Sequence, residues 1–363
     1  STIILFGVSL VHAQKADIII TNGKISTLDT KNSEVQAVAI SGNKILQTGT
    51  NAQVLKMRGN KTKVIDASGN RVIPGLFDSH MHVIRGGRFY NTELRWDGVT
   101  SLKRALQMLK EQAERTPEGQ WVRVVGGWNE YQFEEKRLPT LAEINEATGN
   151  VPTFILYLYG KAWLNKAGLN KLKITGDTPN PSEGLIQKDN NGDPTGLLVA
   201  EPNAFILYST KLPNLNTEEE INSTIQFMSE MNRLGVTGVM DAGGGFQNFP
   251  DDYSITDKLN DQGKITVRLP YFLFAQKKGS EPEDYKRWIG MVELHAERPA
   301  NKVDYHVQGG GENLVGDAAD FENFLIQAKQ NGYQNLLLLT GDKLKQHQFG
   351  DNHQPRSRYL ESV

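Results

Sequence analysis

The chain of 363 residues contains no cysteine, so it can form neither a disulfide framework nor a cysteine-ligated zinc site. Any metal ion must therefore be bound by histidine, aspartate, glutamate or a modified lysine. An excess of charge of one sign is also missing, because 40 Lys and Arg against 42 Asp and Glu give a formal net charge of -2. Nucleic acids are bound by clustered positive charge, and no long basic run occurs, so a nucleic acid partner is not expected.

Long apolar runs are missing as well, and no segment reaches the roughly 20 residues that a membrane-spanning helix needs. The short apolar run at residues 3–11 is followed by Ala13 and by a polar stretch that begins at Gln14. This pattern is typical of the end of a secretory signal peptide, with a buried strand at a domain edge as the alternative. We interpret residues 1–13 as the remnant of such a signal and expect a periplasmic or secreted protein.

Residues 14–73 have the pattern of short strands separated by tight turns. The dipeptide Asn22-Gly23 lies between two apolar segments, which is a strong hairpin signal. A second turn of this kind follows at Gly42-Asn43. We therefore predict a small β-sandwich module in this part of the chain.

Downstream of this module the pattern changes to helices that alternate with apolar strands. One helix is predicted where Leu102, Ala105 and Leu109 share a face. A second helix begins where Thr217 and Glu220 form a capping box. Helices that alternate with buried strands are typical of parallel sheets, so the fold class is α/β, and the length predicts a TIM-type (β/α) barrel.

The predicted barrel domain covers residues 74–327. It includes a loop-rich insertion at about 126–213, which does not fit a single strand–helix repeat. Only about four or five barrel strands can be recognised, whereas a full barrel needs eight. The tail at 328–363 combines one apolar run with a polar stretch that lacks periodicity. We therefore expect an incomplete barrel, and a chain that is unstable and poorly active or inactive.

Residues 74–82 carry the most distinctive chemistry. If they form a strand, Asp78, His80 and His82 share one face, and the two imidazoles lie roughly 6 to 7 Å apart along it. Their ring nitrogens can then converge on one cation, and neutral imidazole suits zinc and similar metals. Asp78 is placed to orient a ligand, and ligands in a barrel lie at the carboxyl ends of strands. A His-x-His pair alone is more often structural or exposed, so its context decides.

That context resembles the amidohydrolase superfamily, and its YtcJ-like branch in particular. The likeness rests on PGLFDSHMH, on the preceding segments DIIITNGKISTLD, AVAISGNKILQTG and VIDASGNRVIPG, and on the later LYGKAWLNKAGL and LGVTGVMDAGGG. It runs from about Asp17 to about Phe324. The resemblance implies hydrolysis of non-peptide carbon–nitrogen bonds in a small-molecule substrate, by a water activated on one or two divalent metal ions, most often zinc.

The family's remaining site residues can be carried over only in part. Glu312, in the segment GGGENL, is the candidate bridging carboxylate, with a surface loop carboxylate as the alternative. Asp241 is expected to line the pocket or to begin a turn. His306 is expected in the core or behind the metal ligands. The catalytic acid/base stays unassigned.

Two other functions stay open at this stage. One is an inactive or truncated remnant of such a hydrolase, or a binding protein, that keeps the barrel architecture without the full metal site. The other is a different metal hydrolase that begins with His-x-His, such as a phosphoesterase, although the preceding β module argues against this. The sequence does not indicate an oligomeric state.

Overall fold

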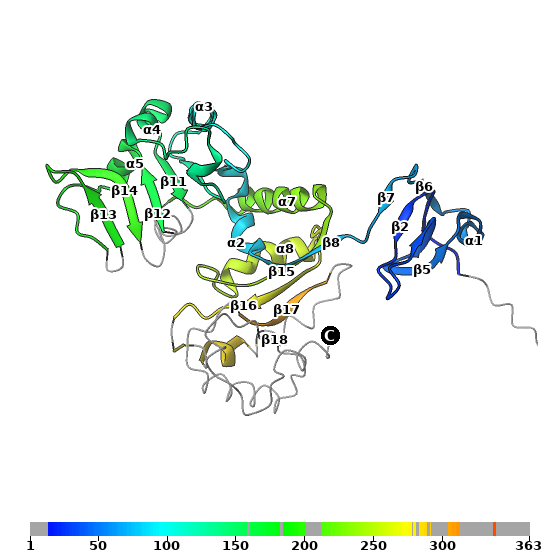
Figure 1. Cartoon of the computed structure of the whole chain (residues 1–363). Helices are drawn as coiled ribbons and strands as arrows, with labels where there is room; N and C mark the ends of the chain where they lie inside the picture. The colour runs from blue at the N-terminus through cyan, green and yellow to red at the C-terminus, as the bar shows by residue number, and fades with distance from the viewer. Residues whose placement is uncertain are drawn as a thin grey trace, which may run out of the picture. The chain divides into compact units, whose positions relative to one another are not determined.

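The structure is a computed structural model that describes residues 14–157, 160–181, 184–200, 212–277, 279–280, 283–288, 291, 304–311 and 337–338. The predicted signal remnant, Glu312 and nearly all of the tail at 328–363 lie outside the described residues. The chain divides into two compact units, residues 1–76 and 77–363, and each is described by itself (Figure 1). Among the helices that the structure describes, none is long and apolar enough to cross a membrane.

The first unit contains two small sheets, of order β5-β4-β1-β6 and β3-β2-β7. The apolar side chains of Ile19, Ala37, Ala39 and Val54 form its core. Its elements are β1 (Ile18–Thr21), β2 (Lys24–Ser26), β3 (Glu34–Val35), β4 (Ala37–Ser41), β5 (Lys44–Gly49), α1 (Asn51–Val54), the 3-10 turn η1 (Leu55–Met57), β6 (Lys63–Asp66) and β7 (Arg71–Val72). A small β module is therefore present, while its packing as a sandwich stays a prediction.

One of the two predicted hairpins is correct. The strands β4 and β5 pair in antiparallel fashion around Gly42, which adopts a φ of 57° that glycine tolerates without strain. The hairpin at Asn22-Gly23 was a wrong prediction, because β1 pairs with β4 and β6 whereas β2 pairs with β3 and β7. The turn at Asn22 carries the chain from one sheet to the other.

The first part of the second unit is built on a six-stranded sheet of order β13-β14-β12-β11-β10-β9. The strands β9, β10 and β11 are parallel, and the others join in antiparallel fashion. Its elements are η2 (Tyr90–Thr92), β9 (Glu93–Leu94), α3 (Leu102–Ala113), β10 (Val122–Val124), η3 (Glu130–Gln132), α4 (Leu141–Thr148), β11 (Thr153–Tyr157), β12 (Lys161–Leu164), α5 (Lys166–Lys171), β13 (Gly184–Lys188) and β14 (Pro194–Ala200).

Both faces of this sheet are covered by apolar side chains. In β11, Phe154 belongs to one core cluster and the next residue, Ile155, to the other, as expected when successive side chains point to opposite faces. Leu109 of α3 and Ile144 of α4 pack into the second cluster, and Leu169 of α5 packs into the first. The continuous apolar run of β11 is therefore explained by burial on both sides.

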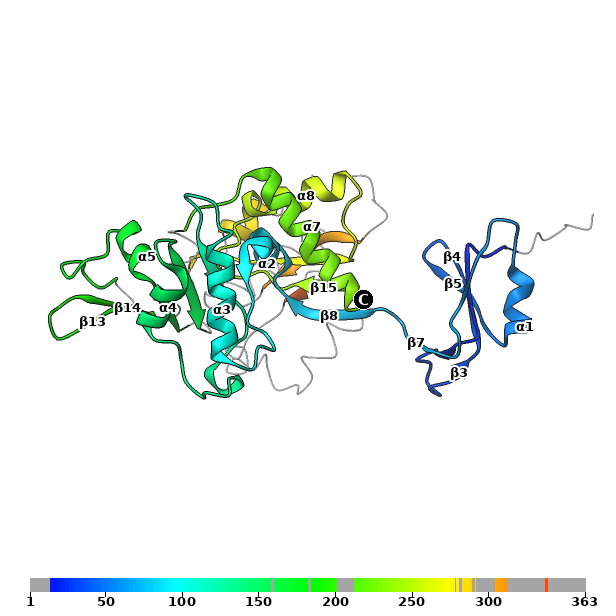
Figure 2. The same cartoon turned by 90° about the horizontal axis from the view of Figure 1, so that it is seen from above.

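The second sheet has the order β18-β17-β16-β15-β8, and its pairs from β15 to β18 are parallel. The helix α7 lies beside both α2 and α8 (Figure 1 and Figure 2). The elements of this half are β8 (Leu76–Met81), α2 (Val83–Arg88), α7 (Thr217–Arg233), β15 (Val236–Asp241), η4 (Asp251–Tyr253), α8 (Ser254–Asp261), β16 (Leu269–Leu273), β17 (Tyr305–Gly310) and β18 (Leu337–Leu338).

The predicted α/β alternation is present, with two corrections. Within the described residues the two sheets of the second unit are separate, so the structure shows no closed barrel. The capping box of α7 is formed by Asn216 and Glu219, one residue earlier than the predicted Thr217 and Glu220. Glu220 instead forms an ion pair with Arg88 of α2.

Candidate metal site

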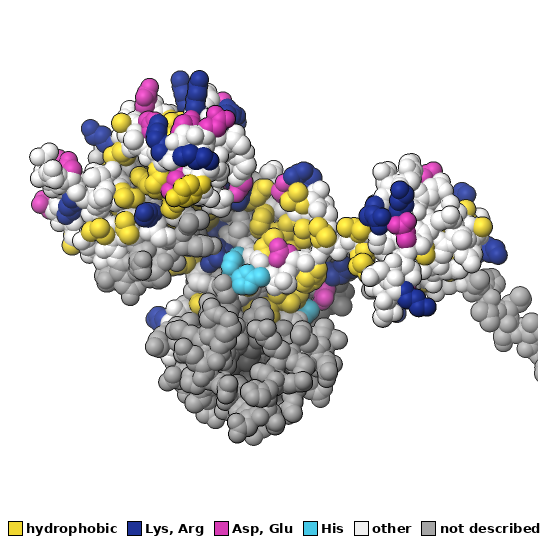
Figure 3. Space-filling view, viewed as in Figure 1, with side chains coloured by type: hydrophobic (Ala, Val, Ile, Leu, Met, Phe, Trp, Pro, Cys, Tyr) yellow, Lys and Arg dark blue, Asp and Glu magenta, His cyan; other side chains and the backbone are white. Residues whose placement is uncertain are grey.

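The two histidines of the His-x-His motif lie at the carboxyl end of β8. His80 is in the strand and exposed, whereas His82 has already left the strand and occupies the N-cap position of α2. Their ring centroids are 5.4 Å apart and the rings are nearly perpendicular, so they are closer than a straight strand predicts. Histidine side chains gather in an exposed patch (Figure 3). Asp78 accepts a hydrogen bond from the backbone N–H of His80 at 3.0 Å.

The tautomer of His82 follows from its hydrogen bond. Its Nδ1 lies 2.6 Å from the carbonyl oxygen of Gly243, and because a carbonyl only accepts, Nδ1 carries the proton. Burial, with smaller contributions from the charge of Arg85 and the neighbouring His80, lowers the pKa of His82 to about 4, although the Gly243 hydrogen bond opposes the shift. At neutral pH the ring is therefore uncharged with its Nε2 lone pair unprotonated, which is the state a metal ligand needs.

The partner of His82 belongs to the segment after β15, residues 242–249, which we call the β15 loop. Asp241, the last residue of β15, has no exposed surface. Its carboxylate accepts hydrogen bonds from the backbone N–H groups of Ile84 and Gly243, each at 2.9 Å, and from Nε2 of Gln247 at 2.8 Å. Burial raises the pKa of Asp241, and these hydrogen bonds oppose the shift. Asp241 therefore ends β15 with its carboxylate bound to the backbone of α2 and of the β15 loop.

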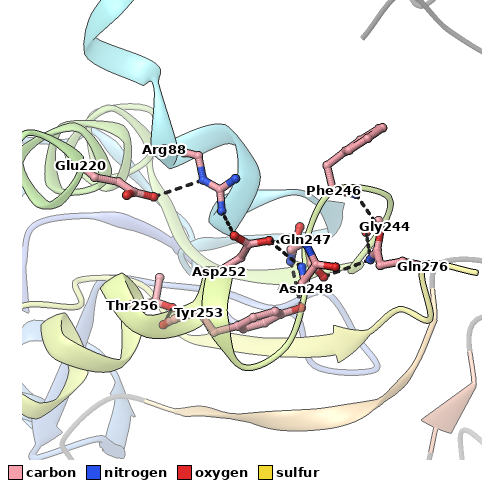
Figure 4. Close-up of polar contacts among 10 residues, drawn as sticks. All are labelled: Arg88, Glu220, Gly244, Phe246, Gln247, Asn248, Asp252, Tyr253, Thr256 and Gln276. Carbon is pink, nitrogen blue, oxygen red and sulfur yellow. Dashed lines mark hydrogen bonds and ion pairs between the residues drawn. The ribbon is translucent and has the colours of Figure 1, made fainter. Parts of the chain in front are cut away.

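Side chains of neighbouring elements form hydrogen bonds with the backbone of the β15 loop (Figure 4). Nε2 of Gln276, which follows β16, donates to the carbonyl oxygens of Gly244 at 3.1 Å and Gln247 at 3.2 Å. Its Oε1 accepts from the backbone N–H of Phe246 at 2.8 Å. From α2, Arg85 donates to the carbonyl of Gly245 at 3.0 Å. The sequence offered no signal for Gln276, because an isolated glutamine after a strand has no distinctive pattern.

An ion cluster joins α2 to the elements around it (Figure 4). Nε of Arg88 donates to Glu220 of α7 at 3.2 Å, and its Nη2 donates to Asp252 of η4. Asp252 also accepts from the backbone N–H and the side-chain amide of Asn248, at 2.6 and 3.1 Å. Sequence analysis did not identify this cluster, which fixes the helix that follows the two histidines.

Of the other predicted site residues that the structure describes, His306 does not join the histidine pair. His306 of β17 is exposed, with its ring nitrogens 2.8 Å from Oδ1 of Asp304 and 2.9 Å from Oε1 of Gln308, so its expected place in the core is wrong. Glu312 lies outside the described residues. No group of three or more His, Asp and Glu residues that could hold a metal ion occurs in the described part of the chain. The donor chemistry of His80 and His82 fits a borderline divalent metal such as zinc, as half of a site.

A pocket of about 260 Å³ lies between the β15 loop and the segment after β16. Phe249 and Trp288 supply aromatic surface, and Lys277 supplies a positive charge. Asp284 and Arg287 form an ion pair at 2.8 Å in its wall. The pocket is therefore suited to an organic group of mixed apolar and polar character.

Comparison with known proteins gives consistent matches. The sequence model of the amidohydrolase family matches residues 63–342. The chain is 32% identical over 235 residues to the N-substituted formamide deformylase of Arthrobacter pascens, covering 63% of this chain and 43% of that protein. It is 32% identical over 187 residues to the putative amidohydrolase YtcJ of Bacillus subtilis, covering 51% of this chain and 35% of that protein. The chain thus spans less than half the length of these two relatives.

A solved structure supports the fold. An uncharacterized metal-dependent hydrolase from Pyrococcus furiosus superposes with a TM-score of 0.56 at 17% sequence identity, covering 88% of this chain and 66% of that one. At this identity the likeness concerns the fold alone. Together with the sequence matches, it confirms the predicted α/β architecture and the predicted resemblance.

Proposed function

Because the chain belongs to the amidohydrolase family, we propose that its protein hydrolyses non-peptide carbon–nitrogen bonds of a small-molecule substrate, with a divalent metal ion held in part by His80 and His82. The observation that carries the proposal is the His82 ring, which the Gly243 carbonyl keeps in the tautomer with an unprotonated Nε2 at the end of β8. N-substituted formamides are the first substrate class to test, because the relative from Arthrobacter pascens is named for them.

When bound, one or two divalent ions, zinc in preference, lower the pKa of a water and polarise the substrate carbonyl. His80 and His82 present their rings from one strand end and from the first position of the next helix. Their nearly perpendicular rings allow two nitrogens to approach one point from different directions. The pocket beside the β15 loop is placed at the carboxyl side of β15 and β16, where ligands bind in parallel α/β folds.

The metal assignment is tested by measuring bound metal in the full chain after incubation with zinc and dialysis. We expect His82→Ala to lose most of the metal and His306→Ala, an exposed histidine away from the pair, to retain it. Equal metal content in the wild type and His82→Ala would contradict the assignment. N-substituted formamides, cyclic amides and phosphoesters then test the reaction, and turnover of phosphoesters alone would favour a phosphoesterase.

A catalytically inactive or truncated remnant is the second candidate. It is favoured by the lack of a third ligand beside His80 and His82 within the described ranges. Stoichiometric metal binding that depends on His82, without turnover of any amide, would support this candidate over the enzyme.

We also propose that the protein is exported. The support is the short apolar run at residues 3–11 followed by the polar stretch from Gln14. With an initiating methionine and a basic segment placed before Ser1, we expect cleavage before Gln14, read by mass spectrometry of the periplasmic fraction. An uncleaved product in the cytoplasm would contradict export.

A further inference from the structure

We propose that Asp241 is a positioning residue that holds the His82 ring in its metal-binding tautomer, by fixing both ends of the hydrogen bond between His82 and Gly243. The inference rests on the proposed role of His82 as a metal ligand. Asp241 lies at the end of β15, 157 residues along the chain from its partner Ile84, and its contacts that the structure describes are with backbone and amide groups rather than with the histidine ring.

The carboxylate of Asp241 binds the backbone on both sides of the hydrogen bond between His82 and Gly243. Oδ2 of Asp241 accepts from the N–H of Ile84, in the first turn of the helix that His82 caps. Oδ1 accepts from the N–H of Gly243, the residue whose carbonyl receives the proton of His82 Nδ1. The backbone that carries the ring and the peptide that orients it are therefore tied to the same side chain.

The carbonyl that faces His82 has little freedom to turn. Gly243 has a φ of 73°, and a Cβ atom there would lie 2.9 Å from the carbonyl oxygens of both Phe272 and Gly311. Gly243 thus lies in close contact with the ends of β16 and β17, where a larger residue does not fit. A fixed carbonyl selects one tautomer, because it attracts a protonated Nδ1 and repels a bare one.

The partners of Asp241 explain why a side chain that only accepts hydrogen bonds is needed at this position. Ile84, Gly243 and Gln247 all present N–H groups to it, so every contact is one in which Asp241 accepts. An asparagine has the same shape, but its amide group would direct its own N–H bonds at one or more of these donors. Asp241→Asn is therefore a near-isosteric change that disturbs this hydrogen bonding.

The test uses nitrogen NMR of the imidazole rings in the metal-free full chain at neutral pH, with His82→Ala identifying the signal of His82. In the wild type we expect a protonated Nδ1 and an unprotonated Nε2. In Asp241→Asn we expect signals of mixed tautomers, together with a zinc affinity reduced by about 10- to 100-fold, the usual effect of losing a residue that orients a metal ligand. Asp189→Asn is the matched control, because Asp189 also accepts hydrogen bonds from backbone N–H groups, those of Asn191 and Asp193, but lies in the turn between β13 and β14.

The outcomes separate this inference from the proposed function. A wild type in which Nε2 carries the proton would overturn the inference even if the variant fails to fold. A folded Asp241→Asn that keeps both the tautomer and the zinc affinity of the wild type would also overturn it. If the wild type shows the expected tautomer, Asp241→Asn loses it, and neither binds metal, the proposed function is contradicted while the positioning by Asp241 stays supported.

Discussion

We expect replacement of Arg88 by methionine to destabilise the protein more than most single substitutions outside the apolar core do. The Arg88, Glu220 and Asp252 side chains are each only about one fifth exposed, at 21%, 20% and 20%. Methionine keeps most of the aliphatic packing and removes the charge. Two partly buried carboxylates on different elements then face each other without their cation.

The loss of stability expected for Arg88→Met lies between two limits. Breaking a fully buried ion pair costs about 3 to 5 kcal/mol, whereas an exposed pair contributes about 0 to 1 kcal/mol. Asp252 keeps its two hydrogen bonds from Asn248, which reduces the penalty. We therefore expect Arg88→Met to lower the free energy of unfolding at pH 7 by about 2 to 3 kcal/mol.

The pH dependence of this stability loss provides a second test. Burial already raises the pKa of Glu220 above its ordinary value of 4.5, and the charge of Arg88 opposes this shift. Since a raised pKa means that the folded state holds the proton more tightly than the unfolded state, stability falls as pH rises from 4.5 through the folded pKa. Without Arg88 the pKa of Glu220 rises further, so the destabilisation should be full at pH 7 and smaller at pH 5.

The assay is urea unfolding followed by far-ultraviolet circular dichroism at both pH values. Arg104→Met is the matched control, because Arg104 pairs with Glu111 at 3.0 Å with both side chains exposed, at 55% and 41%, and should cost less than about 0.5 kcal/mol. Equal losses in the two variants, or an Arg88→Met penalty that is the same at pH 5 and pH 7, would refute the argument.

Three further predictions concern the second unit. The buried side chain of Asn165 makes four hydrogen bonds at 2.8 to 3.0 Å, so Asn165→Ala should cost about 3 kcal/mol, and a loss under 1 kcal/mol in thermal unfolding would be inconsistent with this. Hydrogen bonding by Arg137 lowers the pKa of Glu143 to about 2, so the stability advantage over Glu143→Gln, roughly 0.5 to 1 kcal/mol, should be present above pH 4.5 and vanish as the pH falls to 2. Gly196 has a φ of 86° and its Cβ would lie 2.4 Å from a carbonyl oxygen, whereas the space around Gly98 is open. Gly98→Ala should therefore cost only the roughly 1 to 2 kcal/mol of left-handed strain. Gly196→Ala should cost more than this and lower the melting temperature further than Gly98→Ala, and equal melting temperatures would contradict the prediction.

Local patterns were predicted well from the sequence. The strand expected within residues 74–82 is β8, and the helix with Leu102, Ala105 and Leu109 on its buried face is α3. The hairpin at Gly42 was also correct. Such features depend on neighbours within a few residues, whose preferences act whatever the rest of the chain does.

Choices between equally good local patterns were decided by packing. Both Asn216 and Thr217 are followed three residues later by a glutamate, so either could begin the helix as a capping box. The helix begins with Asn216, which leaves Glu220 to pair with Arg88. In the same way the turn at Asn22 does not make a hairpin, because β1 and β2 find their partners in different sheets.

The sequence alone thus pointed to the two histidines of the candidate site, and only the tertiary structure decided the state in which they are held. The Gly243 carbonyl that sets the tautomer of His82 is 161 residues away along the chain, and Asp241 is oriented by donors from α2 and from the β15 loop. His306 has a strand pattern like that of a core residue and is nevertheless exposed. Proton positions and burial depend on groups brought together by folding, and no spacing within the sequence specifies these partners.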